Sequence, residues 1–280
     1  MTPTAQSLAV HGVELSWSEQ GSGSPTFVLC HGYTGSSHDW ALHVDALSER
    51  RRVVTYDQRG HGHSTKVGHL AGYTIEQLVS DQESFLTAVG RGPVDLLGHS
   101  MGGRVVMTLA LKRPDLVRSL ILMDTSAWSF QPKDEGLAAL VRNWFESLDP
   151  ETDAVPNVTA LGGPEQALVE AQVTPEWQRE RDAAIAGMDP YAFKGLAAEL
   201  WPKVEDGEQS LRRQLSSVAC PVTVLVGQHD HPLVDQAPEL ADAVARGRLC
   251  VIDGAFHSPQ LTHPEAWRAA VEAHLAWAAE

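Results

Sequence analysis

The stretch Val94-Asp95-Leu96-Leu97-Gly98-His99-Ser100-Met101-Gly102-Gly103 decides the fold of this 280-residue chain. Residues 94–97 have the pattern of a short strand, and residues 101–112 are small and apolar, as in a packed helix. Between them, residues 98–102 match the pattern G-x-S-x-G. Ser100 is therefore expected at a sharp turn from strand to helix, where glycine on both sides avoids steric clashes. Such a turn presents the hydroxyl at the carboxyl edge of a sheet, beside a helix N-terminus that stabilises negative charge.

Short apolar runs alternate with helical patterns along most of the chain. Runs that are apolar throughout, instead of at every second residue, indicate strands covered on both faces, as in a parallel sheet. The alternation predicts an α/β protein with a mostly parallel, doubly wound sheet and right-handed crossovers. The runs expected to form this sheet are 26–30, 52–56, 94–97, 120–123, 222–226 and 249–252, with 8–10 and 13–17 as an antiparallel hairpin at one edge.

Residues 127–205 interrupt this alternation with several helical patterns and no strand signal. One apolar stripe follows the i, i+3, i+4, i+7, i+8 spacing of a helix face, at Leu137, Leu140, Val141, Trp144 and Phe145. We therefore expect residues 1–126 and 206–280 to form an α/β core. Residues 127–205 are expected to form a helical cap, or lid, inserted over the edge of the sheet.

The serine turn needs a base and an acid to work as a nucleophile, because a serine at its ordinary pKa reacts poorly. In proteins with this turn, the chain order is serine, acid, histidine. His257 follows the last predicted strand and should reach the edge where Ser100 lies. His263, the other histidine after that strand, has the pattern of a helix start.

Two aspartates follow predicted strands and compete for the role of the acid. Asp230 is preferred, because the short glycine-containing loop after residues 222–226 can reach the histidine loop. Asp124 follows residues 120–123 and is the main alternative, with Asp235 as the third. If Asp230 is the acid, Asp124 is expected to be a helix cap or turn residue at the entrance to the cap.

A tetrahedral intermediate needs two N–H donors. Met101, directly after the serine, should supply one, and Tyr33 in the loop 31–35 should supply the other. Gly32 is expected to border the substrate, whereas His31 is interpreted as a structural residue behind the loop. The substrate pocket should lie between these groups and the cap, with the aromatic candidates Trp128, Phe130, Trp144, Phe145 and Trp201.

Among these aromatic residues, Trp128 and Phe130 are preferred as pocket residues because they begin the insertion, and Trp144 is kept with them. The alternative is that most of the aromatic rings pack the core of the cap itself. Arg142 or Arg179 could bind a substrate carboxylate, although either is equally compatible with a solvated helix face.

Three segments together resemble the α/β-hydrolase superfamily: residues 30–37 (CHGYTGSS), 56–64 (YDQRGHGHS) and 98–103 (GHSMGG). The similarity is to the branch with a serine nucleophile and a helical cap, which includes esterases, enol-lactonases and menaquinone-pathway synthases. The resemblance implies an α/β-hydrolase fold, with Ser100 as nucleophile, Asp230 and His257 as its partners, and Tyr33 and Met101 as oxyanion donors. It also implies that residues 57–62 form a structural turn. Relatives that cleave epoxides or carbon–halogen bonds carry a carboxylate at the elbow, which Ser100 replaces here.

The predicted function is hydrolysis of a carboxylic ester or lactone of a small to medium apolar substrate, through an acyl-enzyme on Ser100. This is a serine hydrolase of the carboxylesterase or lactonase type. One alternative uses the same triad for carbon–carbon bond hydrolysis or for a lyase reaction like that of the menaquinone-pathway synthases. A second is a ligand receptor that retains a hydrolase pocket and turns over slowly.

The composition limits the partners. There are 21 Lys and Arg against 36 Asp and Glu, a formal charge of −15, which disfavours nucleic acid and membrane surfaces. Three cysteines without a CxxC pair, no recognisable signal peptide and no long apolar run favour a cytoplasmic protein. The pairs His61/His63 and His229/His231 are weak indications of a metal site. We expect no metal or other cofactor, a small-molecule substrate, and a monomer or homodimer.

Overall fold

The computed structural model describes residues 5–128, 134–157, 163–201 and 210–280. Its described strands form one sheet in the order β1-β2-β4-β3-β5-β6-β7-β8. The strands β1 and β2 form an antiparallel hairpin, β2 is antiparallel to β4, and all neighbours from β4 to β8 are parallel. Their bounds are β1 Gln6–Val10, β2 Val13–Gln20, β3 Phe27–Cys30, β4 Val53–Tyr56, β5 Val94–His99, β6 Val117–Met123, β7 Val222–Gly227 and β8 Gly247–Ile252.

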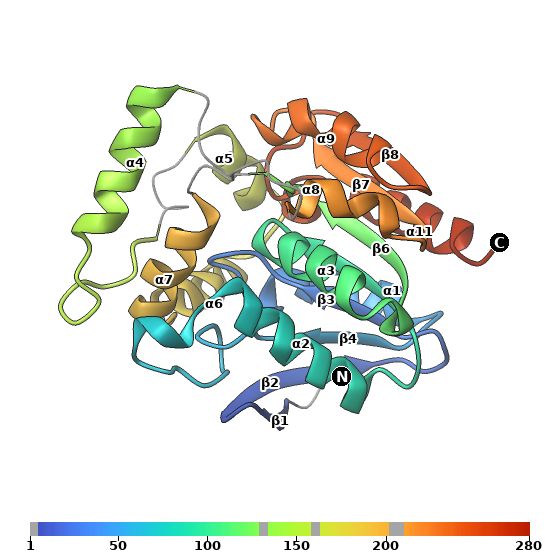
Figure 1. Cartoon of the computed structure of the whole chain (residues 1–280), viewed down its shortest axis with the longest axis horizontal. Coiled ribbons are helices and arrows are strands. Elements are labelled where there is room, and N and C mark those ends of the chain that lie inside the picture. Colours follow the sequence, from blue (N-terminus) through green and yellow to red (C-terminus); the bar gives the residue numbers. More distant parts are fainter. Residues whose placement is uncertain (1–4, 129–133, 158–162, 202–209) are drawn as a thin grey trace.

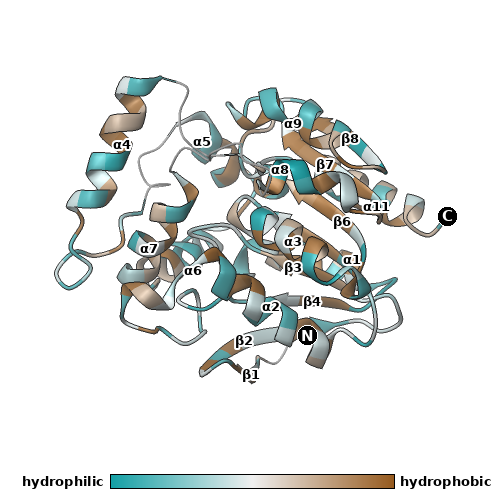
Figure 2. Ribbon diagram, in the orientation of Figure 1, coloured by the Kyte–Doolittle hydropathy of each residue, from teal (hydrophilic) through white to brown (hydrophobic). Residues whose placement is uncertain are grey.

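Helices cover both faces of the sheet, as the continuous apolar runs predict (Figure 1). Alternate side chains of each strand enter opposite cores, so that Val28 and Cys30 pack into one core while Phe27 and Leu29 pack into the other. The first core is closed by α2 (Ile75–Val89), α3 (Met101–Lys112) and α9 (Leu233–Asp242), and the second by α1 (Ala41–Ser48) and α11 (Pro264–Trp277). Figure 2 shows the resulting apolar strands between helices with polar outer faces.

In the described part of the expected cap region, four helices follow β6: α4 (Glu135–Ser147), α5 (Pro164–Glu170), α6 (Pro175–Ala186) and α7 (Pro190–Leu200). They gather at one end of the molecule, with α4 as the outermost element (Figure 1). Shorter helices complete the chain, namely η1 (Ser37–Trp40), η2 (Leu70–Gly72), η3 (Pro114–Leu116), α8 (Leu211–Gln214), η5 (Leu215–Ser217) and α10 (Pro259–Thr262). No strand occurs between β6 and β7 in the described parts of that region, as expected for a helical insertion. The exact limits of the cap at 127 and 205 stay a prediction.

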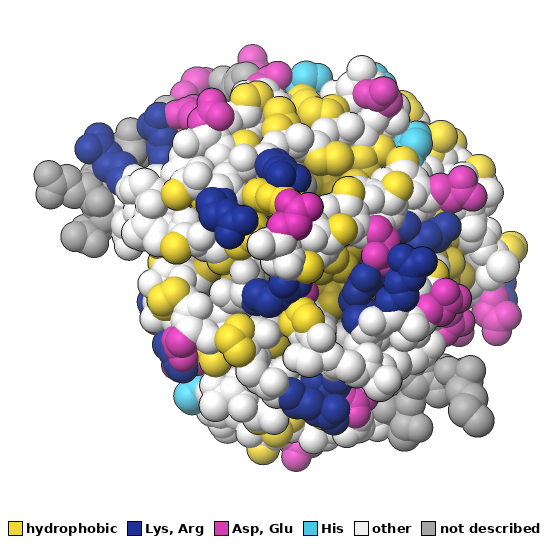
Figure 3. Space-filling model, turned by 90° about the vertical axis from the view of Figure 1, so that its right-hand side faces the viewer, with side chains coloured by type: hydrophobic (Ala, Val, Ile, Leu, Met, Phe, Trp, Pro, Cys, Tyr) yellow, Lys and Arg dark blue, Asp and Glu magenta, His cyan; other side chains and the backbone are white. Residues whose placement is uncertain are grey.

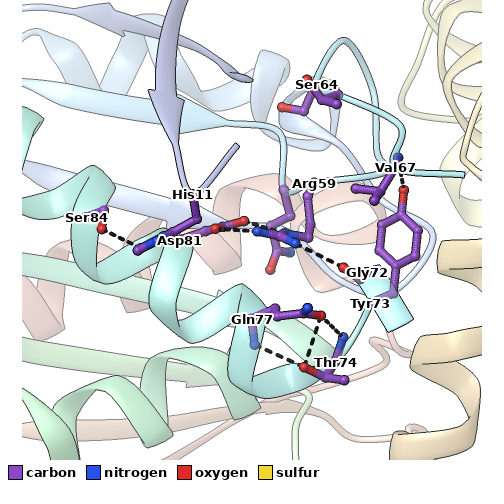
Figure 4. A network of polar contacts seen from close by, with 12 residues as sticks. His11, Arg59, Ser64, Val67, Gly72, Tyr73, Thr74, Gln77, Asp81 and Ser84 are labelled. Carbon is purple, nitrogen blue, oxygen red and sulfur yellow. Dashed lines mark hydrogen bonds and ion pairs between the residues drawn. The ribbon is translucent and has the colours of Figure 1, made fainter. Parts of the chain in front are cut away.

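Hydrogen bonds and an ion pair connect the turn at residues 57–64 to α2 (Figure 4). The Arg59 guanidinium donates to both carboxylate oxygens of Asp81 at 2.6 and 2.7 Å, and to the Gly72 carbonyl at 3.0 Å. At the start of α2, Thr74 and Gln77 form a reciprocal capping box. These contacts hold the turn beside the carboxyl ends of β3 and β4.

Strand β6 begins at Val117, three residues before the predicted start. Arg118 and Ser119 are polar, so the sequence pattern gives no strand signal there, but both side chains donate to the Asp95 carboxylate on neighbouring β5.

Strand β8 lies at one edge of the sheet and exposes Leu249 and Val251. Figure 3, which views this side of the molecule, shows hydrophobic and Lys or Arg side chains intermingled on the surface. Within the described residues, every helix is too short or too polar to cross a bilayer.

Candidate active site

Ser100 occupies a strained turn between β5 and α3, with φ 53° and ψ −115°. Its N–H donates to the Met123 carbonyl at 2.9 Å, and the Thr125 hydroxyl donates to its carbonyl at 2.6 Å. A Cβ on Gly98 would lie 2.4 Å from the Gly102 carbonyl oxygen, and one on Gly102 would lie 2.5 Å from a backbone oxygen of the loop after β3. Both glycines are therefore required by close backbone approach. A positive φ at a serine costs about 1–3 kcal/mol and persists only because its surroundings impose it.

The loops after β7 and β8 bring Asp230 and His257 together. His257 Nδ1 donates to Asp230 Oδ2 at 2.9 Å. Burial alone would lower the pKa of His257, but the charge and hydrogen bond of Asp230, helped by the charge of Glu165, raise it to about 9. Burial opposes ionisation of Asp230, yet His257 outweighs it and holds the Asp230 pKa below its ordinary value. Asp230 and His257 thus form a charge-stabilised pair.

Asp124 lies behind this pair, in the bend directly after β6, as expected of a turn residue. Its side chain is fully buried and accepts the Gly227 N–H at 2.8 Å. Polar atoms of Asp124, Asp230 and His257 all lie within 4.8 Å of one another. Burial and the nearby Asp230 carboxylate raise the pKa of Asp124 well above its ordinary value. The third candidate, Asp235, instead faces His231 at 3.4 Å near the surface.

Asp124, Asp230 and the half-buried His257 also have the ligand types of a cation site. A hydrogen bond already joins two of them, however, and it uses Nδ1 of the only histidine in the group. A cation bound by Nδ1 would have to break this bond. The arrangement therefore suits proton transfer better than ion binding.

Ser100 and His257 line the same cavity. Both residues are described, and no hydrogen bond joins the serine hydroxyl to the imidazole in this structure. Such bonds are often long without substrate and shorten when the complex forms. His99 also stabilises the loop that carries His257, because its Nε2–H donates to the His257 carbonyl at 2.8 Å.

The loop after β3 places two N–H groups near the serine. Neither the Tyr33 nor the Met101 N–H has an acceptor in the described part of the chain. A Cβ on Gly32 would lie 3.3 Å from the Ser100 Cβ, so this loop passes directly beside the serine. His61 Nε2 donates to the Tyr33 carbonyl at 2.6 Å and thereby orients the peptide that follows. His31 lies behind the loop as expected, with Nδ1 donating to the Gly32 carbonyl at 2.8 Å.

A cavity of about 550 Å³ lies between these groups and the cap. The predicted pocket residues Gly32 and Trp144 line it, as do Phe145 and Trp201. Trp128 does not, and its ring lies under the Arg212 guanidinium, 5.4 Å from the ring centroid. The prediction that Trp128 lines the pocket is therefore wrong. Arg104 on α3 donates a hydrogen bond to the Trp128 carbonyl, which holds this part of the chain beside α3. Phe130 lies outside the described residues.

Several cavity residues were missed by the sequence analysis. Phe193 on α7 stacks on Tyr33 with ring centroids 5.1 Å apart, and the Tyr33 hydroxyl donates to the Phe193 carbonyl. Glu165 and Arg181 come from α5 and α6, whereas the suggested Arg142 and Arg179 do not line the cavity. A spacing of four residues from buried Trp177 to Arg181 to buried Ile185 places Arg181 on the inner face of its helix, which is a signal that the sequence does contain.

Comparison with known proteins agrees with this fold. Residues 25–264 match the model of the α/β-hydrolase fold family. The chain is 26% identical to the (E)-2-((N-methylformamido)methylene)succinate hydrolase of Acinetobacter baylyi, over 92% of each chain. A hydrolase from Pseudomonas aeruginosa PA01 superposes with a TM-score of 0.80 at 27% identity, covering 98% of this chain and 99% of that one.

The enol-lactonase of Burkholderia xenovorans LB400 superposes with a TM-score of 0.75 at 26% identity, covering 97% of this chain and all of that one. The matched family segment includes the serine turn, both partner loops and the helices between β6 and β7. The doubly wound sheet and the resemblance predicted from three short segments are therefore confirmed. The chain belongs to the α/β-hydrolase family.

Proposed function

We propose that this chain is a serine hydrolase that cleaves a carboxylic ester or lactone through an acyl-enzyme on Ser100. One observation carries the proposal: a strained serine, the His257–Asp230 pair and Tyr33 border one cavity, and the Tyr33 and Met101 N–H groups beside the serine have no acceptor among the described residues. This combination contains a nucleophile, a base with its orienting acid, and donors for an oxyanion. Hydrolase relatives that match nearly the whole chain support it.

In the proposed reaction, Asp230 accepts the Nδ1–H of His257 and leaves Nε2 as the base. Nε2 takes the proton of Ser100 as its oxygen attacks the substrate carbonyl carbon. The carbonyl oxygen becomes negative and accepts hydrogen bonds from the Tyr33 and Met101 N–H groups, each of which contributes about 10²–10³-fold in rate in comparable sites. The imidazolium then gives its proton to the departing alkoxide, and the acyl-enzyme forms.

Water completes the cycle. His257 removes a proton from a water molecule, whose oxygen attacks the acyl carbon. The second tetrahedral intermediate uses the same two N–H donors, and the returning proton restores the Ser100 hydroxyl. In a lactone the departing alkoxide remains attached to the acyl group, so the product is a single hydroxy acid.

The cavity favours a substrate of small to medium size with an apolar ring or acyl chain. Its volume of about 550 Å³ lies within the usual range for small-molecule sites. Aromatic side chains of the cap, Phe145, Phe193 and Trp201, cluster around the Tyr33 ring with centroids 5.1–6.4 Å from it. The similarity to an enol-lactonase supports a lactone among the candidates.

The test is covalent labelling together with turnover. A fluorophosphonate should add one phosphonyl group per chain at Ser100, and p-nitrophenyl butyrate should be hydrolysed. Ser100→Ala should lose the label and about 10⁶-fold in kcat. Ser216→Ala, on an exposed residue, is the matched control and should keep both. A Ser100→Ala protein that folds and retains either the label or normal turnover would refute the proposal.

A further inference from the structure

The cavity holds one cation in an arrangement that suits an anionic ligand. Arg181 on α6 is the only Lys or Arg among the described residues that line the cavity. Its side chain is 12% exposed, so most of it is removed from water. Its Nε faces Asp39 Oδ1 on η1 at 3.5 Å, and no other hydrogen bond or ion pair to the guanidinium is found in the described part of the chain. The two terminal nitrogens therefore have no protein acceptor there.

Asp39 holds one edge of the guanidinium and leaves the other edge toward the cavity. The aspartate is itself fixed, because its Oδ2 accepts the Ser36 N–H at 3.2 Å in a capping box. The same oxygen packs closely against the loop 31–35, since a Cβ on Gly35 would lie 2.3 Å from it. Burial raises the pKa of Asp39, and the charge of Arg181 opposes this shift.

The other acids of the cavity already have partners. Asp230 accepts from His257, and Glu165 accepts the Ser258 N–H at 2.6 Å. Arg181 lies near the reaction centre, because its charge contributes to the lowered pKa of His99, the residue before Ser100. A planar guanidinium whose two terminal nitrogens are free binds a carboxylate by two parallel hydrogen bonds.

We propose that Arg181, oriented by Asp39, binds a carboxylate of the substrate, so that the natural ester or lactone carries a second, anionic group. The aromatic cluster from α4 and α7 would contact the apolar part of the same molecule, while α6 and η1 hold its charged end. The inference rests on the proposed attack by Ser100 and adds the substrate class to it.

The test compares two esters that differ mainly in charge: mono-p-nitrophenyl adipate and the p-nitrophenyl ester of monomethyl adipate. The wild-type protein should prefer the charged ester in kcat/KM. Arg181→Gln should lower the ratio of charged to neutral kcat/KM by about 10–100-fold, mainly through the KM of the charged ester, as expected when one charged hydrogen-bonding partner is lost. Arg181→Lys should restore part of the ratio.

Arg179→Gln is the matched control, because Arg179 is exposed on the same helix and does not line the cavity. It should leave the ratio unchanged. A direct binding measurement needs no turnover: calorimetry should detect adipate binding to the wild-type and Arg179→Gln proteins, and binding at least about ten-fold weaker to Arg181→Gln.

The inference is overturned if the wild-type protein shows no preference for the charged ester and no adipate binding. It is also overturned if folded Arg181→Gln loses activity toward both esters in equal proportion, because Arg181 would then have a general structural role. Neither result affects the proposed function, which instead fails if Ser100→Ala still hydrolyses the neutral ester normally.

Discussion

Glu165 accepts a hydrogen bond from the backbone N–H of Ser258, at 2.6 Å, and so joins cap helix α5 to the loop that carries His257. Its negative charge also contributes to the raised pKa of His257. Glu165→Gln keeps an acceptor oxygen but removes the charge, so the pKa of His257 should fall. Because His257 must be neutral to act as the base, the rising limb of the kcat/KM profile should move to lower pH.

Glu165→Ala removes both the charge and the acceptor, and it should lower kcat in addition to moving the profile. Glu176→Gln, on an exposed residue of α6, is the control and should match the wild-type profile. An unchanged profile in Glu165→Gln would show that this carboxylate does not act on the histidine.

The pH dependence of the wild-type protein should follow His257. With its pKa raised to about 9, the fraction of neutral imidazole grows through the alkaline range, so kcat/KM should rise with pH and level off above about 9. Asp230→Asn removes the main stabilising charge, so the remaining activity should level off at lower pH, with kcat reduced about 10⁴-fold. Rate profiles for p-nitrophenyl butyrate, with stable folding checked at each pH, measure both effects. A wild-type rate that falls between pH 7 and 9 would contradict the assignment.

Burial and the Asp230 carboxylate raise the pKa of Asp124 well above its ordinary value, which favours its protonated form. Asp124→Asn resembles that protonated state and should keep kcat within about three-fold, whereas loss of the acid partner of the base costs about 10⁴-fold. A loss of that size in a folded Asp124→Asn protein would make Asp124 the triad acid in place of Asp230.

The same residue should affect stability in a pH-dependent way. When the pH rises above the unfolded value of 3.8, the unfolded chain releases the Asp124 proton while the folded chain retains it, so the wild-type free energy of unfolding falls. The Asp124→Asn variant has no titrating group at this position, so its free energy of unfolding does not fall for this reason. Its melting temperature relative to wild type should increase from pH 4 to neutral pH, and a constant difference would refute the raised pKa.

Gly102→Ala should destabilise the protein, because the new Cβ would lie 2.5 and 2.6 Å from the backbone oxygens of His31 and Cys30. Overpacking of this kind costs about 1–3 kcal/mol. Gly136→Ala, in the first turn of helix α4, is the matched control, since its Cβ would meet only one side-chain oxygen, at 3.2 Å, and alanine favours helices. Urea denaturation should separate the two variants, and equal stability of both would contradict the close approach.

Features set by local pattern could be predicted from the sequence. The serine turn, the parallel strands and the loop positions of Asp230 and His257 follow from strand order and glycine placement. The place of Asp124 could not be predicted, because it depends on sheet register: its N–H pairs with the Leu225 carbonyl on β7, which brings the side chain to Gly227. The path of Trp128 likewise depends on Arg104, a residue more than twenty positions earlier.

Tyr33 contributes to the site twice, through its backbone N–H beside Ser100 and through its hydroxyl, which donates to the Phe193 carbonyl on α7. Outward movement of α7 would therefore release the side chain of the very residue that offers an oxyanion donor. The backbone of Tyr33 would then lose one of the contacts that hold its side chain in place. An acyl group on Ser100 should therefore be hydrolysed faster while α7 keeps its contact with Tyr33.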